Sequence, residues 1–162
     1  MVGREGMVGV QVALGVSSTP LRAVVKGQGV ALRIGVSALE AQLVDSPELR
    51  RVLNRYVYVL MTQRATSAIC LRHHQIGHRL ARWLLMTQDR ARTDHFRVTQ
   101  EFLAYMLGVR RVGITAAART LQHEGLIRYG RGELTVLHRP GLEKMACGCY
   151  ASDRRSYVET LG

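Results

Sequence analysis

The amino-acid sequence predicts an α+β fold from three patterns along its 162 residues. Residues 1–45 hold short β-prone stretches separated by glycines, which predicts short strands joined by turns. Residues 46–72 repeat apolar side chains at helical spacing and predict one long helix. Residues 98–137 predict two short helices followed by two strands. We therefore expect a β-rich N-terminal part joined to a helical C-terminal part.

The two short helices are predicted to meet at Gly108. Apolar residues recur at helical spacing before this glycine and again after it, and glycine supplies the backbone freedom that a tight turn needs. Thr99 can cap the first helix, because its hydroxyl can accept a hydrogen bond from an amide of the first turn. The second helix, over residues 110–124, is expected to be basic outward and apolar inward. Its outward polar residues are Arg110, Arg111, Thr115 and Arg119.

The second helix is followed by a predicted hairpin. Gly125 is a candidate C-cap, residues 126–129 and 134–137 are β-prone, and residues 130–132 (Gly-Arg-Gly) predict the tight turn between them. Two helices followed by a hairpin form a winged helix-turn-helix. Such a unit places its second helix in the major groove of DNA.

A set of residues spread over this motif resembles a known family. The matching positions are Leu103, Gly108, Val109, Arg111, Leu121, Gly125, Leu126, Ile127, Arg131 and Gly132. They resemble the C-terminal domain of Crp/Fnr transcription regulators, and the similarity spans residues 6–150, most densely 79–137. The resemblance implies a DNA-binding domain at 73–140, followed by a tail at 141–162. It also implies that residues 1–45 are the remnant of a cyclic-nucleotide-binding β-roll whose front is absent.

The ligand cassette of that family is altered here. The family has a Gly-Glu-Leu turn and then an Arg-Ser/Thr-Ala triplet, whose glutamate and arginine hold the ribose and the cyclic phosphate. The corresponding stretches are Gly9-Val10-Gln11 and Thr19-Pro20-Leu21-Arg22-Ala23, which lack the glutamate and place the arginine out of register. We therefore expect no binding of a cyclic nucleotide and no other cofactor.

The long helix at 46–72 is predicted to mediate dimerisation. Ser46 can cap it, and Pro47 suits its first turn. Residues at spacings of four and three form a heptad seam typical of paired helices. They are Leu49, Leu53, Tyr56, Leu60, Gln63, Ser67 and Cys70. The seam predicts a homodimer; the alternative is that this wide apolar helix is the core of a monomer.

The segments around the motif have weaker patterns. An apolar stripe predicts a helix over residues 75–88, which should form the floor on which the motif packs. Residues 88–97 are polar and predict a loop. Residues 142–150 predict one more helical turn, and the last dozen residues are expected to be loose.

The charge of the chain indicates a polyanionic partner. A formal net charge of +11 and a pI near 10.6 favour double-stranded DNA, because basic side chains release counterions from phosphates. The alternative for any single arginine is a solvated surface. The sequence has no apolar run long enough to cross a membrane and no signal-peptide pattern, so we expect a soluble cytoplasmic protein without membrane association. The family resemblance adds RNA polymerase as a further candidate partner.

The cysteines and histidines do not predict a metal site. Cys147-Gly148-Cys149 offers two soft ligands without a second pair, so inert thiols are expected. His74 and His78 lie four residues apart, but we expect exposed imidazoles at a helix junction rather than metal ligands. No nucleophile elbow, P-loop or paired-carboxylate pattern occurs. The chain is therefore not expected to be an enzyme.

These patterns together predict a sequence-specific transcription regulator that binds a palindromic operator through residues 110–124. Arg111 is expected to bond a guanine, and Thr115 to face the bases. The expected phosphate contacts are Thr99, Arg110, Arg119 and Arg131. Two positions that read bases in the resembled family are apolar here, at Val112 and Ala116, so Val112 is expected to meet a thymine methyl. The alternative is a truncated regulator that dimerises with a full-length relative.

Overall fold

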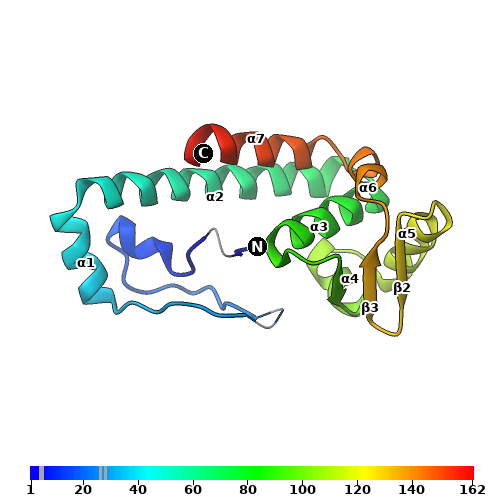
Figure 1. The fold of residues 1–162 in the computed structure, drawn as a ribbon, viewed down its shortest axis with the longest axis horizontal. Helices are drawn as coiled ribbons and strands as arrows, with labels where there is room; N and C mark the ends of the chain where they lie inside the picture. Colours follow the sequence, from blue (N-terminus) through cyan, green and yellow to red (C-terminus); the bar gives the residue numbers. More distant parts are fainter. Residues whose placement is uncertain (4–5, 26, 28) are drawn as a thin grey trace.

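A long helix connects the two ends of the molecule. The computed structural model describes residues 1–3, 6–25, 27 and 29–162. Helix α2 (Pro47–His73) runs along an elongated molecule, with α1 (Val36–Asp45) at one end and the helix-turn-helix at the other (Figure 1). The predicted start of α2 is confirmed, because the Ser46 side chain accepts a hydrogen bond from the Leu49 amide at 3.2 Å and Pro47 is the first helical residue.

Three helices form the core of the C-terminal part. They are α3 (Ile76–Ala91), α4 (Gln100–Leu107) and α5 (Arg111–His123). Helix α3 is the predicted floor, and its buried apolar residues pack against the inner faces of α4 and α5. These α3 residues are Leu80, Ala81, Leu84 and Leu85.

A three-stranded antiparallel sheet forms the wing. Its strands are β1 (His95–Arg97), β2 (Ile127–Gly130) and β3 (Glu133–Val136), in the order β1-β3-β2. The predicted hairpin is confirmed with each strand displaced by one residue. The prediction that residues 88–97 form only a loop is wrong, because α3 continues to Ala91 and β1 follows. A three-residue strand is too short to show a period in the sequence, and it forms here because β3 offers it a pairing edge.

The C-terminal segment is helical. Helix α6 (Arg139–Met145) follows the wing, and α7 (Cys149–Leu161) then runs alongside α2 (Figure 1). The expectation of loose final residues is therefore wrong. A buried ion pair holds α7 in place: Arg82 of α3 donates to Asp153 of α7 at 2.5 Å.

The strands expected in residues 1–45 do not form in the described part of this segment. The 3-10 helix η1 (Val10–Leu14) and helix α1 occur instead, and the described residues between them form no strand. A β-prone segment becomes a strand only when another strand satisfies its backbone groups. Here the β-prone residues stand in solvent, and Leu32, for example, is 100% exposed.

The predicted dimer seam of α2 lies against the same chain. Leu49 and Leu53 pack on a small cluster from η1 and α1, formed by Val12, Leu39 and Leu43. The Tyr56 hydroxyl accepts a hydrogen bond from the Met7 amide at 3.1 Å. Segments of the same chain that are distant in sequence therefore cover this part of the predicted seam.

None of the helices in the described residues combines the length and the apolar character needed to cross a membrane.

Candidate DNA-binding surface

The turn between α4 and α5 has the local structure that the sequence predicts. Thr99 caps α4, its hydroxyl oxygen accepting from the Phe102 amide at 3.1 Å. Gly108 ends α4 in the left-handed region, at a φ of 58° that glycine adopts without a Cβ penalty. Val109 then packs against the core, and its amide donates to the Ala104 carbonyl at 3.0 Å. This turn fixes the direction in which α5 leaves α4.

Two polar contacts hold the helix-turn-helix together. The buried Arg79 of α3 donates from its guanidinium to the Leu107 carbonyl at the end of α4, where backbone acceptors lack helical partners. Thr115 of α5 donates to the Gln100 side-chain oxygen of α4 at 2.7 Å. Sequence reasoning missed Arg79. The available signal was a charged residue immediately before the apolar face of α3.

The outer face of α5 presents most of the predicted site residues together. Arg110, Arg111 and Arg119 are exposed, and Val112 is 72% exposed. Thr115 is half-buried, because its hydroxyl faces α4. No side chain caps the first turn of α5, where Arg110 is the N-cap residue. Backbone amides and guanidinium groups therefore occur together at this end of the helix, an arrangement suited to an anion.

The wing presents a second basic edge. Arg131 is exposed at a φ of 51° in the β2–β3 turn, and Gly132 follows at 82°. Two positive φ values match the turn that twisted two-residue hairpins require. Arg128 of β2 is also exposed, and sequence reasoning did not single it out. The alternation of Ile127, Arg128 and Tyr129 in a predicted strand was the signal for it.

Tyr129 joins the wing to the loop that precedes α4. Its hydroxyl donates to the Val98 carbonyl at 2.8 Å. Burial raises the pKa of Tyr129 above its ordinary value, and the positive charge of Arg111 opposes this rise. Arg111 is therefore near enough to the wing for its charge to act on β2.

Most of the positive charge on α5 and the wing is not neutralised by ion pairs. Glu133 binds His95 at 2.9 Å and Arg97 at 3.1 Å, so the acidic group of the wing is already engaged. Within the described ranges, no ion pair involves the five arginines of α5 and the β2–β3 hairpin. These are Arg110, Arg111, Arg119, Arg128 and Arg131. The surface formed by α5 and the hairpin, hereafter the basic surface, is therefore positively charged.

Potential metal ligands gather at another place, the junction of α2 and α7. Cys70, His74, Cys147 and Cys149 lie together there and are the one such group among the residues that the structure describes. Burial raises the pKa of the Cys70 thiol to about 12, so this thiol is protonated at neutral pH. His78 does not join His74 in this group, because its Nδ1 contacts the Met145 carbonyl at 2.6 Å.

The basic surface lies within a segment of the chain that matches the model of a known protein family. Residues 78–145, fewer than half of the chain, match the family model of the Crp-like helix-turn-helix domain. No curated protein matches the chain.

Two solved structures illustrate the similarity. A proposed Crp/Fnr-family transcriptional regulator from Eubacterium rectale is 26% identical, with a TM-score of 0.48, over 68% of this chain and 51% of that one. A CRP-family transcriptional regulator from Thermus thermophilus is 21% identical, with a TM-score of 0.53, over 70% and 55%. The chain thus spans about half the length of these proteins, and the second of them supports the fold.

The matched residues span most of α3 and all of the observed winged helix-turn-helix that follows it. Residues 78–145 therefore resemble the Crp-like helix-turn-helix domain in sequence, and the fold agrees with the resemblance predicted from the sequence.

Proposed function

We propose that this protein is a transcription regulator that binds double-stranded DNA in a sequence-specific manner, with α5 in the major groove. The observation that supports this most strongly is the first turn of α5, where an uncapped helix end and two exposed arginines, Arg110 and Arg111, face outward. An α-helix fits the major groove, and the hairpin of a winged domain then lies near the DNA backbone.

Different residues of the basic surface have different roles in this proposal. Arg111 donates two hydrogen bonds to a guanine, through O6 and N7. Val112, which is exposed and apolar, contacts a thymine methyl group. Thr115 faces the base edges beside it, and its hydroxyl must leave Gln100 to donate to a base.

The remaining predicted contacts are to phosphates. The Thr99 oxygen caps α4, which leaves its hydroxyl hydrogen available to a phosphate oxygen. Arg110, Arg119 and Arg131 are exposed and supply positive charge on either side of α5 and at the tip of the wing. These contacts strengthen binding and set its orientation without reading the sequence.

A palindromic operator requires two copies of the domain, and α2 offers a face for their association. Its buried side is covered within the chain, whereas Tyr58, Met61 and Ile69 are exposed on the opposite side. Two copies of this exposed face, related by a two-fold axis, would bury their apolar side chains against one another. We therefore place the homodimer contact on this side of α2 rather than on the seam predicted from the sequence.

Selection from random-sequence duplexes tests the proposed function. The purified protein is incubated with the pool, bound duplexes are recovered by gel shift, and the recovered sites are sequenced. We expect a two-fold symmetric site whose half-sites are about one helical turn, roughly 10 base pairs, apart. Recovery of unrelated sequences, with binding that disappears as salt is raised, would leave only generic attraction to polyanions.

A second candidate is a regulator that acts by dimerising with a longer relative. The exposed apolar face of α2 favours it, because that face can pair with a similar helix in another protein. Mixing the chain with a full-length paralogue and measuring native masses distinguishes the two candidates. Mixed dimers that no longer bind the paralogue's operator would support the second one.

A further inference from the structure

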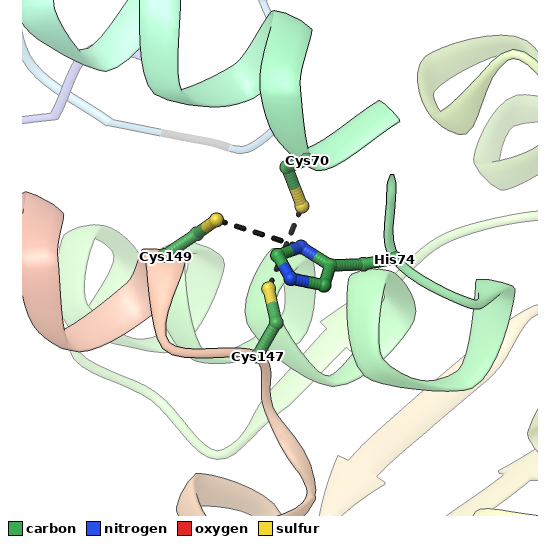
Figure 2. A group of neighbouring side chains, drawn as sticks. All are labelled: Cys70, His74, Cys147 and Cys149. Carbon is green, nitrogen blue, oxygen red and sulfur yellow. Dashed lines mark hydrogen bonds between the residues drawn. The ribbon is translucent and has the colours of Figure 1, made fainter. Parts of the chain in front are cut away.

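We propose that Cys70, His74, Cys147 and Cys149 bind one Zn²⁺ ion in a tetrahedral site. The four side chains converge from two segments of the chain, and their ligand atoms all lie within 4.8 Å of one another (Figure 2). Three sulfurs and one imidazole nitrogen are a common ligand set of structural zinc sites. This site is separate from the basic surface that is proposed to bind DNA.

The measured separations fit a single ion at the centre. Zinc lies about 2.3 Å from a thiolate sulfur and about 2.0 to 2.1 Å from an imidazole nitrogen, so neighbouring ligand atoms in a tetrahedral site are about 3.5 to 3.8 Å apart. The Cys70 and Cys147 sulfurs are 3.5 Å apart. The Cys149 sulfur lies 3.6 Å from Nδ1 of His74. Two opposite edges of the tetrahedron are therefore close to the required length.

The secondary structure explains why these ligands meet. Cys70 lies in the last turn of α2, and His74 caps that helix one turn later, where its backbone amide donates to the Cys70 carbonyl at 3.1 Å. Cys147 lies between α6 and α7, and Cys149 is the first residue of α7. Cys70 and His74, which are four residues apart, thus meet Cys147 and Cys149, which are two residues apart. The ion would join the end of α2 to the start of α7, across more than 70 residues of sequence.

The surroundings favour a closed structural site. The three cysteines are at most 9% exposed, and His74 is half-buried. Four protein ligands leave no open position for a substrate, which distinguishes such a site from a catalytic one. Soft thiolates select zinc over magnesium or calcium, which prefer oxygen ligands. A cluster of several irons would occupy the centre and hold its ligands further apart than a mononuclear ion does.

A disulfide between Cys70 and Cys147 would explain less of this geometry than a zinc site does. The Cys70 and Cys147 sulfurs are adjacent, but all three cysteines are free thiols in the structure. A bond between these two would not explain why Cys149 and His74 point to the same centre. A zinc ion uses all four side chains.

Metal analysis of the intact protein tests the proposal. The full chain is purified under reducing conditions with added Zn²⁺, and the bound metal is counted by native mass spectrometry and elemental analysis. We expect one zinc per chain. Substitution by Co²⁺ should give the visible absorption of tetrahedral cobalt and an intense charge-transfer band from several thiolates. Absence of stoichiometric zinc, or a weak octahedral cobalt spectrum, would overturn the proposal.

Adjacent histidines provide matched variants. His74→Ala should lower zinc affinity by more than about 100-fold, because loss of a ligand exceeds the cost of losing an outer partner. His73→Ala, at an exposed position of the same helix end, should bind zinc as the wild type does. Equal affinity of both variants would exclude His74 as a ligand. If circular dichroism shows that a variant does not fold, the cobalt spectrum of the wild type still tests whether the site is tetrahedral and rich in thiolates. None of these measurements uses DNA, so their outcome is independent of the proposed regulator function.

Discussion

At the scale of single residues, the proposed DNA contacts differ in what they read. Arg111 lies in the first turn of α5 beside the wing, whereas Arg119 lies two turns further along the same helix. Both side chains are exposed and neither forms an ion pair among the described residues. In the proposed function Arg111 contacts a base and Arg119 contacts a phosphate, and this difference is measurable.

Arg111→Ala should cost roughly 1 to 3 kcal/mol of binding to the selected site and relax the preference at one base position. The cause is the loss of a bidentate contact to guanine. Gel-shift titrations on the selected site and on its single-base variants measure both effects. Arg119→Ala is the matched control and should weaken binding to all these duplexes equally. A uniform loss for Arg111→Ala as well would contradict its role as a reader of bases.

The buried Tyr150 links α7 to α3 through a half-buried network of hydrogen bonds. Its hydroxyl donates to Asp89 at 2.9 Å and accepts from Arg139 at 2.7 Å. Burial, assisted by the hydrogen bond to Asp89, raises the pKa of Tyr150 from 10.0 to about 12. The folded protein therefore retains this proton at a pH where the unfolded chain loses it.

Stability should fall with rising pH because of this tyrosine. Below the pKa of Tyr150 in the unfolded chain, the tyrosine is protonated in both states and does not change stability with pH. Between the two pKa values only the unfolded chain loses the proton, which lowers the free energy of the unfolded state and reduces stability. At about pH 11 the loss amounts to about 1.4 kcal/mol relative to about pH 9. Urea denaturation at both pH values, for the wild type and Tyr150→Phe, measures it. The variant should lose less stability over this interval by that amount, and identical losses would exclude Tyr150 as the cause.

At the scale of secondary-structure elements, one buried ion pair joins α7 to α3. Arg82 and Asp153 have side chains that are 10% and 5% exposed, and they join α3 to α7 at 2.5 Å. Arg82 also donates to Ser67 of α2 at 3.1 Å. The pair therefore lies where three helices meet.

Asp153→Ala should destabilise the protein by about 3 to 5 kcal/mol, because it leaves the Arg82 charge buried without its partner. Urea denaturation measures the change. The double variant Arg82→Met/Asp153→Leu removes both charges and should recover most of the loss. If the double variant is as unstable as the single one, packing of α7 rather than the unpaired charge is responsible.

The exposed face of α2 gives a prediction about association. Met61 is 66% exposed in the single chain. Met61→Glu should abolish the proposed homodimer, because the new carboxylate would be buried without a partner at the interface. Light scattering measures the mass. Val158→Glu, which places the same charge at an exposed apolar position of α7, is the control and should remain dimeric. A dimeric Met61→Glu protein would place the interface elsewhere.

The sequence predicted the elements whose signals are local. The caps at Ser46 and Thr99, the turn at Gly108 and the hairpin at 130–132 depend on neighbouring residues, and the structure contains all of them. The features that the sequence did not predict depend on contacts between residues that are far apart in the sequence. β1 needs β3, α7 needs α2 and Arg82, and Cys147 contacts Cys70 from 77 residues away in the sequence. Conversely, the β-prone residues before 36 that the structure describes find no pairing strand, so their local preference is not realised.

At the scale of the whole molecule, α2 runs from a small apolar cluster near one end to the helix-turn-helix domain at the other (Figure 1). The proposed zinc site lies at the end of α2 from which α3 begins, so the ion would stiffen the junction between the proposed dimer helix and the domain. The net charge of +11 alone would produce binding to any DNA. In the proposed function, specificity therefore has to come from the outer face of α5.

The ratio of affinities for two duplexes tests that central claim most directly. One duplex is the site recovered by selection, and the other has the same base composition in shuffled order; both are titrated at low and at physiological salt. We expect the selected site to bind at least about 10³-fold more tightly at physiological salt. The preference should persist while both affinities fall as salt is raised. A ratio near one at both salt concentrations would contradict sequence reading by α5.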